Sequence, residues 1–400
     1  MDRFRSARHM LETVQPERPV LGLRPHAAAN AARFFLEHFP GEVAYAYKAN
    51  SSVFLLGALY GAGIRAFDVA SLPELEDAGT IPDATLHFMH PVKSRRAIRR
   101  AYHDFGVKCF SLDSHDELQK IMEETGNPTD LQLFVRITVP ALKSSIPLEN
   151  KFGVSADRAV ELLQATRQCC DELGVTFHVG SQTATPEAYI SALDTCRRII
   201  VKAGVVIDGV DVGGGFPARY SQAEPIPLRD YFNTIETHFE DLPVSHDCRL
   251  ICEPGRALVA EAESLIVRVD ARRGNELYIN DGSYGGLFDA AHLGFDFPVR
   301  MVRPSDAAGG REPFSLWGPT CDSIDYIKGP FFLPADVREG DYLEFGNMGA
   351  YVRAIAGTFN GYGSFDEVIL EDPPMYTMFG ASASASATRG KVDASQPANS

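Results

Sequence analysis

Charged and polar residues stand near the C-terminal ends of several short apolar segments of this chain. Lys48 lies near the end of VAYAYKA, Asp68 lies within IRAFDVAS, and Arg136 comes near the end of LQLFVRI. A single charge at a strand end is usually solvated or paired, so no one of them identifies a site. Their shared position favours a common site, whose other candidates are His178 and Ser181 of VTFHVGS and Glu253 and Arg256 of RLICEPGRAL.

Three consecutive glycines, Gly213, Gly214 and Gly215, occur in the segment DVGGGFP. Glycine lets backbone N–H groups come close to an anion, and phosphate is the natural candidate. A tight bend is the alternative interpretation of the same residues. The segment lacks the G-x-G-x-x-G spacing that opens a dinucleotide-binding helix, so a dinucleotide is disfavoured.

A strand-end lysine and a phosphate site together suggest the cofactor pyridoxal 5'-phosphate (PLP). We expect Lys48 to be buried, because desolvation lowers the pKa of a lysine and leaves an amine that forms a Schiff base with the aldehyde. We expect His178 to stack on the pyridine ring and Glu253 to pair with the ring nitrogen. A carboxylate at that nitrogen keeps the ring protonated and makes it a strong electron sink.

Short apolar segments rich in β-branched residues alternate with segments of helical period along most of the chain. Several of the helical segments end in glycine, and one of them is predicted over residues 155–174. This alternation predicts an α/β fold, a (β/α)8 barrel at residues 20–258, whose strand ends face a common mouth. The predicted strands are 43–49, 64–71, 84–89, 108–114, 131–137, 175–181, 209–215 and 249–255.

The pattern changes after about residue 258, where turns rather than long helices separate the strands. Residues 259–377 therefore predict a C-terminal antiparallel β-domain, which we expect some N-terminal residues to join. Residues 378–400 are expected to be disordered, because from residue 380 on Ala alternates with Ser and the sequence then becomes polar. Strands are predicted in AESLIVRVDARRG, NELYIND, EPFSLWGP, VREGDYLEFGN and AYVRAIAG.

Composition and charge argue against several classes of protein. The formal net charge of −15, with scattered Lys and Arg, disfavours a nucleic-acid partner. The chain shows no apolar run of membrane-spanning length and no signal-peptide core, so we expect a cytoplasmic protein with no membrane partner. Its seven cysteines include no CxxC pair, so no disulfide framework and no metal site are expected.

In combination, these segments resemble the fold-type III PLP-dependent decarboxylases, the group of ornithine, lysine and diaminopimelate decarboxylases. The resemblance runs from about residue 20 to 370. It implies a PLP-binding barrel of the alanine-racemase type, followed by a β-domain. The motifs that carry it are YAYKAN, FDVAS, FHVGSQ, DVGGGFP, EPGR, GPTCDSID and GAYVRAIAGTFNGY.

The resemblance implies a role for each matched residue. Lys48 is implied to be the Schiff-base lysine, His178 the ring-stacking histidine and Glu253 the partner of the pyridine nitrogen. The three glycines, Arg256 and Tyr351 are implied to reach the phosphate, and Glu74 joins Asp68 and Arg136 at supporting positions. The full cofactor-binding set is Lys48, Asp68, Arg136, His178, Ser181, Gly213, Gly214, Gly215, Glu253, Arg256 and Tyr351.

The second domain of this family contributes to the active site of the partner subunit in a homodimer. Cys321 is implied to donate a proton to the carbanion, and Asp322 to bind the distal ammonium group of a small amino-acid substrate. Tyr284, Phe359 and Asp289 complete the substrate-binding candidates.

The segment after Tyr284 departs from the family pattern. Ornithine decarboxylases usually carry a Tyr-Asp-His run there, whose aspartate provides a second carboxylate for the distal amine. This chain instead reads NDGSYGGLFDAAHLGFDFP. The second carboxylate is therefore absent, or it comes from Asp289 or Asp296.

We expect a PLP-dependent amino-acid carboxy-lyase that converts a basic L-amino acid, ornithine or lysine, to its diamine. Diaminopimelate and arginine are alternative substrates, although diaminopimelate decarboxylases usually carry glutamate after the cysteine, where this chain has Asp322. An amino-acid racemase usually places arginine near the ring nitrogen, which Glu253 contradicts. A non-catalytic regulatory homologue tends to lose the lysine or the cysteine, and this chain has both.

Overall fold

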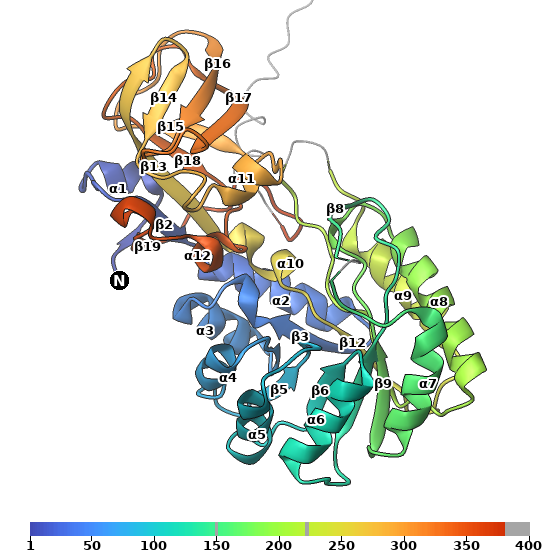
Figure 1. Ribbon diagram of the computed structural model, residues 1–400. Helices are drawn as coiled ribbons and strands as arrows, with labels where there is room; N and C mark the ends of the chain where they lie inside the picture. Colours follow the sequence, from blue (N-terminus) through green and yellow to red (C-terminus); the bar gives the residue numbers. More distant parts are fainter. Residues whose placement is uncertain (149–150, 221–223, 381–400) are drawn as a thin grey trace, which may run out of the picture. The chain divides into compact units, whose positions relative to one another are not determined.

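The computed structural model describes residues 1–148, 151–220 and 224–380 of the chain. These residues form two compact units (Figure 1). The barrel unit comprises Ala28–Ala218 and Pro225–Val259, and the β-unit comprises Met1–Ala27, Arg219–Glu224 and the chain from Ala260 onward. Most of the tail predicted to be disordered, residues 381–400, lies outside the described residues.

Eight parallel strands close into a barrel, which confirms the predicted α/β fold. Closure is made where Ile251 and Cys252 of the last strand pair with Glu42 and Val43 of the first. Each strand is shorter than predicted, because the residues that follow it turn into loops at the barrel mouth. The strands are β3 (Glu42–Ala46), β4 (Ala66–Asp68), β5 (Thr85–Phe88), β6 (Cys109–Leu112), β7 (Gln132–Arg136), β9 (Glu172–Thr176), β11 (Gly209–Asp211) and β12 (Arg249–Cys252).

Helices lie outside the ring of strands (Figure 1). Serine caps start three of them: Ser71, Ser94 and Ser114 each accept a hydrogen bond from the backbone N–H three residues later. The helix predicted over 155–174 ends at Arg167, and Glu172 already belongs to β9. The helices are α2 (Pro25–His38), α3 (Val53–Ala62), α4 (Leu72–Ala78), α5 (Arg95–His103), α6 (His115–Thr125), α7 (Ala156–Arg167), α8 (Glu187–Ala203), α9 (Leu228–Glu240) and α10 (Arg256–Val259).

An ion network joins the N-terminal ends of four barrel strands. Arg249 donates to Glu172 at 2.6 Å, to Gln132 at 3.2 Å and to Glu42 at 3.3 Å. Above it, apolar side chains including Phe134 and Ile251 fill the barrel. This end of a barrel serves stability, so the opposite end is where chemistry is expected.

The β-unit is built on one nine-stranded, mainly antiparallel sheet. Its N-terminal strand β2 pairs antiparallel with β13 and parallel with β19. A short helix, α1 (Ala7–Leu11), packs its apolar residues into the core of this unit. The strands are β1 (Arg3–Phe4), β2 (Val20–Leu23), β13 (Glu263–Arg273), β14 (Glu276–Ile279), β15 (Val299–Val302), β16 (Arg311–Trp317), β17 (Tyr326–Pro334), β18 (Tyr342–Phe345) and β19 (Asp366–Leu370).

Two strand predictions were wrong. The segment AYVRAIAG forms helix α12 (Val352–Ile355), because Tyr351 takes a left-handed conformation that starts a helical turn instead of continuing an extended chain. Ser181 is not part of the sixth barrel strand: β9 ends at Thr176, and Ser181 begins β10 (Ser181–Thr183), which pairs antiparallel with β8 (Ser144–Ile146).

In the described residues no helix is both long enough and apolar enough to cross a lipid bilayer.

Candidate active site

Lys48 and Asp68 meet at the C-terminal ends of two neighbouring strands. Lys48 lies in a single 3-10 turn, η1 (Tyr47–Ala49), directly after β3, and Asp68 is the last residue of β4. The Nζ atom of Lys48 lies 2.7 Å from Oδ2 of Asp68, whose side chain is buried. The Lys48 side chain itself is 43% exposed, so the prediction of a buried lysine was wrong. The residue is exposed because it follows the strand into a turn instead of lying inside the barrel.

Glu74, expected at a supporting position, completes the cap of helix α4. Its N–H donates to Oγ of Ser71 at 3.3 Å, and its Oε2 accepts from the N–H of Ala70 at 2.7 Å. This pair of hydrogen bonds resembles a capping box, except that the carboxylate accepts from the residue before the N-cap, and it holds the turn that follows Asp68. Burial raises the pKa of Glu74, and the charge of Asp68 acts in the same direction.

The three glycines lie where no side chain would fit. Gly213 and Gly215 have left-handed φ angles of +65° and +108°. A Cβ atom on Gly213 would lie 2.3 Å from the carbonyl oxygen of Phe177, and one on Gly214 would lie 2.8 Å from that of Glu253. The loop is therefore bare backbone packed against the neighbouring strand ends, which is the arrangement that backbone binding of an anion requires.

Asp211, which sequence reasoning missed, holds this glycine loop in place. Its Oδ1 accepts from the N–H of Gly213 at 2.9 Å, and its Oδ2 accepts from the hydroxyl of Thr176 at 2.7 Å. The side chain is fully buried, and burial raises its pKa to about 7. The signal that could have identified it is an aspartate that ends a short strand two residues before the first glycine.

Arg256 contributes a buried cation near the glycine loop. It is only 4% exposed, and its Nε donates to Oγ of Ser181 at 3.3 Å. A buried arginine beside a loop of bare backbone is a combination suited to phosphate.

His178 is held as a neutral ring between the sixth and seventh barrel strands. Burial, with the positive charges of Arg136 and Lys48, lowers its pKa to about 3. Its Nδ1 accepts a hydrogen bond from the N–H of Gly180 at 3.0 Å, so the neutral ring carries its proton on Nε2. Nε2 lies 3.2 Å from where a Cβ of Gly214 would be, which brings the ring against the glycine loop.

Glu253 directly follows the last barrel strand, β12, and one of its carboxylate oxygens is unsatisfied. The residue is 6% exposed, and its Oε1 is buried without a hydrogen-bond partner in the described part of the chain. Burial raises its pKa well above the usual range, and the negative charges of Asp211 and Asp68 raise it further. A buried acid of this kind needs a partner, and a ring nitrogen that shares its proton would provide one.

Further predicted residues gather in the β-unit around one loop. The hydroxyl of Tyr284 donates to Oδ2 of Asp322 at 2.6 Å, and the Tyr284 ring lies 5.0 Å from the ring of Phe359. This hydrogen bond lowers the pKa of Asp322 and raises that of Tyr284 to about 12, so Asp322 is ionised at neutral pH. Cys321 is exposed, and its N–H donates to the side chain of Asn360 at 3.1 Å.

Asp289, Asp296 and Tyr351 occupy other positions of the β-unit. Asp289 is buried on the short helix α11 (Phe288–His292), whereas Asp296 is exposed in the loop that follows. Tyr351 precedes α12 with a φ angle of +69°. Neither aspartate lines the pocket that borders Cys321 and Asp322, whose lining includes Asp270, Tyr278 and Trp317.

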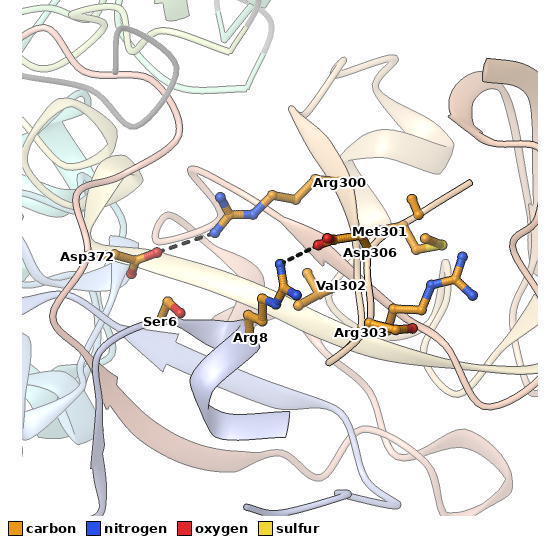
Figure 2. A pocket seen from close by; sticks show the side chains of 10 residues that line it. Ser6, Arg8, Arg300, Met301, Val302, Arg303, Asp306 and Asp372 are labelled. Atoms are coloured by element: carbon orange, nitrogen blue, oxygen red, sulfur yellow. Dashed lines mark hydrogen bonds and ion pairs between the residues drawn. The ribbon is translucent and has the colours of Figure 1, made fainter. Parts of the chain in front are cut away.

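A second pocket of the β-unit lies between the N-terminal segment and β15 (Figure 2). Arg8 bonds Asp306 at 3.0 Å, and Arg300 lies 3.3 Å from Asp372. These guanidinium groups are paired with carboxylates, and no predicted site residue is among the lining residues. We therefore assign this pocket no part in the candidate site.

Comparison with known proteins identifies the family. A family model described as "pyridoxal-dependent decarboxylase, pyridoxal binding domain" matches residues 26–260, which contain the whole barrel. The chain belongs to the pyridoxal-dependent decarboxylases. Its cofactor is therefore PLP, and the chain is a PLP-dependent amino-acid carboxy-lyase, as the sequence predicted.

Relatives of this decarboxylase carry different names. It is 30% identical to the lysine/ornithine decarboxylase of Selenomonas ruminantium, over 86% of this chain and 87% of that protein. It is 34% identical to antizyme inhibitor 2 of Xenopus laevis, over 80% of this chain and 73% of that one. Among solved structures it resembles the arginine decarboxylase of Paramecium bursaria Chlorella virus bound to agmatine, with a TM-score of 0.81, 27% identity, and coverage of 90% and 98%.

The barrel residues of this decarboxylase fit PLP. Lys48 offers an amine at the mouth, and the glycine loop and Arg256 suit the phosphate. The Oε1 atom of Glu253, which has no hydrogen-bond partner among the described residues, suits the ring nitrogen. The neutral ring of His178 can stack without adding charge. The barrel unit alone therefore contains an amine for the aldehyde of PLP, a site suited to its phosphate and an acid suited to its ring nitrogen.

Proposed function

We propose that this enzyme removes the α-carboxyl group of a basic L-amino acid, ornithine or lysine, and releases the diamine. The observation that carries the proposal is the ionised Asp322, held by Tyr284 on a loop next to Cys321. An ionised carboxylate attracts the distal ammonium group that both amino acids carry. Relatives named as lysine/ornithine decarboxylases support the same substrate class.

The barrel residues bind and orient the reactants. When bound, PLP supplies the electron sink for the electron pair left at the α-carbon after CO2 departs. Lys48 would hold the cofactor through its amine, which Asp68 orients by a hydrogen bond at 2.7 Å. Glu253, whose raised pKa favours a protonated carboxyl group, would share that proton with the ring nitrogen and so favour loss of CO2.

The residues of the β-unit complete the reaction. Cys321 donates its thiol proton to the α-carbon, and Asp322 binds the distal ammonium group of the substrate. Tyr284 and Phe359 form an aromatic wall beside Asp322, which suits the methylene chain of a diamino acid. The racemase alternative is disfavoured because a carboxylic acid, Glu253, directly follows the last barrel strand.

A substrate screen with Asp322→Asn tests this proposal. Wild-type enzyme should release CO2 from ornithine or lysine in preference to arginine or diaminopimelate. Asp322→Asn should lower kcat/KM for the preferred substrate by roughly tenfold to a hundredfold, mainly through KM, because the amide no longer attracts the ammonium group. Asp296→Asn and Asp289→Asn, assayed alongside, test for the second carboxylate. Preference for diaminopimelate in the wild type would refute the assigned role of Asp322.

We further propose that the enzyme is a homodimer in which each active site combines the barrel of one subunit with Cys321 and Asp322 of the other. The two sets of residues belong to different compact units. The loop that carries the cysteine also exposes apolar surface: Ile324 is 57% exposed, and Phe359 and Tyr362 nearby are also exposed. A second copy of the chain would cover that surface in a two-fold interface.

Mixing two inactive variants should restore activity. After Lys48→Ala and Cys321→Ala subunits exchange at random, half of the dimers are mixed, and each mixed dimer has one site free of both changes. Activity should therefore reach about a quarter of wild type. The measurement is CO2 release after exchange has been verified by native mass spectrometry. Each variant mixed with itself is the control, and continued inactivity of the mixture after full exchange would contradict the shared site.

A further inference from the structure

The connection between β16 and β17 carries both Cys321 and Asp322, and we call residues 318–325 the cysteine loop. The strands on either side pair directly, with Trp317 opposite Tyr326. The loop has little apolar anchorage, because its one large apolar side chain, Ile324, is 57% exposed. Its conformation therefore depends on hydrogen bonds rather than on burial of apolar surface.

Asp325, the last residue of the cysteine loop, makes four of these hydrogen bonds with one carboxylate. Its Oδ1 accepts from the N–H and the hydroxyl of Ser283, at 2.7 and 3.0 Å. Its Oδ2 accepts from the N–H and the hydroxyl of Thr320, at 3.0 and 2.8 Å. Thr320 precedes Cys321 and Ser283 precedes Tyr284, so the carboxylate joins the two segments that carry the substrate-binding candidates.

The space around this carboxylate is shaped for it. Asp325 is 1% exposed. A Cβ atom on Gly282 would lie 2.2 Å from its Oδ1, and one on Gly318 would lie 2.1 Å from the same oxygen. Both backbone segments can approach the carboxylate this closely only because neither position has a side chain.

Asp325 also fixes the backbone on which Asp322 sits. Its N–H donates to the carbonyl of Asp322 at 3.1 Å, and its carbonyl accepts from Gly318 at 2.8 Å. The carboxylate of Asp322 is then held by the N–H of Ile324 at 3.1 Å and by Tyr284 at 2.6 Å. Ile324 directly precedes Asp325, and Tyr284 directly follows Ser283, which donates to the carboxylate of Asp325.

We propose that Asp325 is a positioning residue that sets where Cys321 and Asp322 lie relative to Tyr284. The inference rests on the proposed function, since it assigns Asp325 to the loop that delivers the proton and binds the distal ammonium group. A carboxylate suits the position best, because all four groups donate to it and two of them, the backbone N–H groups of Ser283 and Thr320, can only donate. An asparagine would turn its NH2 group toward one of these backbone N–H groups and lose that hydrogen bond, and the hydroxyl on the same side would have to accept instead of donate.

Asp325→Asn provides the first test. We expect kcat/KM to fall about a hundredfold, as is typical when reacting groups are misplaced by about 1 Å, with cofactor binding to the barrel unchanged. Hydrogen exchange followed by mass spectrometry should be at least about tenfold faster in peptides covering residues 282–284 and 318–325. Exchange elsewhere in the β-unit should stay at the wild-type rate. A hundredfold loss of activity without faster exchange in these peptides would overturn the positioning role.

Two further sets of variants keep the proposal falsifiable if Asp325→Asn does not fold. Thr320→Val removes one donor to Asp325 and should lower kcat/KM about tenfold, whereas Thr320→Ser keeps the hydroxyl and should restore it. Asp341→Asn is the matched control, since Asp341 is a buried aspartate of the same unit that accepts from the N–H of Arg338 at 2.8 Å. Equal activity in Thr320→Val and Thr320→Ser, or an equal loss in Asp341→Asn, would refute the inference.

Cys321→Ala distinguishes this inference from the proposed function. If Cys321→Ala keeps wild-type turnover, the proton-donor role fails, and the exchange data still report whether Asp325 holds the cysteine loop. If Cys321→Ala is inactive while Asp325→Asn matches wild type in both turnover and exchange, the proposed function stands and the positioning role of Asp325 is refuted.

Discussion

Replacing Lys48 by alanine should abolish decarboxylation, by roughly four decades or more, and should eliminate the covalent attachment of the cofactor. The reason is that Lys48 is the amine at the mouth of the barrel, 2.7 Å from Asp68. Reduction of the wild-type enzyme with borohydride should fix PLP onto the peptide that contains Lys48. The same treatment of Lys48→Ala should fix none, as measured by absorbance and peptide mass spectrometry.

Lys48→Arg separates the charge of this residue from its chemistry. An arginine can keep the ion pair with Asp68, but its guanidinium does not lose a proton and cannot form the link. We expect the same loss as in Lys48→Ala, with a normal fold in both variants because the side chain is 43% exposed. Lys202→Ala, an exposed lysine on α8, serves as the control and should keep wild-type activity. Borohydride-dependent attachment to a different lysine in Lys48→Ala would refute the assignment.

Glu253→Gln should lower kcat by up to about three decades while leaving PLP bound. Glutamine fills the same space but cannot share a proton with the ring nitrogen, so the charge that favours loss of CO2 is not formed. The phosphate contacts assigned to the glycine loop and Arg256 do not involve this side chain. Single-turnover rates and cofactor titration measure the two effects separately. Glu172→Gln, at the opposite end of the barrel, is the control and should affect stability more than turnover. Wild-type turnover in Glu253→Gln would remove Glu253 from the ring nitrogen.

The raised pKa of Glu253 also predicts how the stability of the cofactor-free enzyme depends on pH. Above its usual value of 4.5, the acid is ionised in the unfolded chain but protonated in the folded barrel, so the folded state binds the extra proton. The contribution of Glu253 to the free energy of unfolding is therefore fully present below pH 4.5 and is lost as the pH rises through the raised pKa of the folded state. Asp211, raised from 3.8 to about 7, acts with the same sign. The fall in melting temperature between about pH 5 and 8 should be smaller in Glu253→Gln, and an equal fall would contradict the raised pKa.

The barrel was predictable from sequence because its signal is local. Each strand is a short apolar run buried on both faces, and each helix has its own period and caps, so the order of elements can be inferred without any long-range contact. The strand ends were overextended for the same reason. Lys48 and Ser181 lie at the ends of apolar segments and were therefore assigned to the strands. In the structure Lys48 lies in a 3-10 turn, and Ser181 lies in β10, which pairs with β8.

The β-unit was less predictable because its sheet joins segments from both ends of the chain. Strand β2 lies between β19 and β13, and the strands β1, β2, β15, β17 and β19 of this unit were not predicted at all. Pairing of this kind depends on partners that are distant in sequence, and short half-exposed strands have weak patterns of their own. The predicted strand at AYVRAIAG was wrong because a sequence of alternating alanines also suits a helical turn. The left-handed conformation of Tyr351 interrupts the extended chain and precedes helix α12.

The sequence by itself determined the fold class, the cofactor and the residue types of the candidate site, because these follow from local patterns and from motifs of neighbouring residues. Only the tertiary structure decided which of these residues meet. Asp211, which holds the glycine loop, accepts a hydrogen bond from Thr176, and Asp325, which holds the cysteine loop, accepts one from Ser283, across 35 and 42 residues of sequence respectively. Neither aspartate differs in type from the many solvated aspartates of the chain. Their importance comes from burial beside donors that the fold brings in from distant segments, and a local pattern contains no information about such donors.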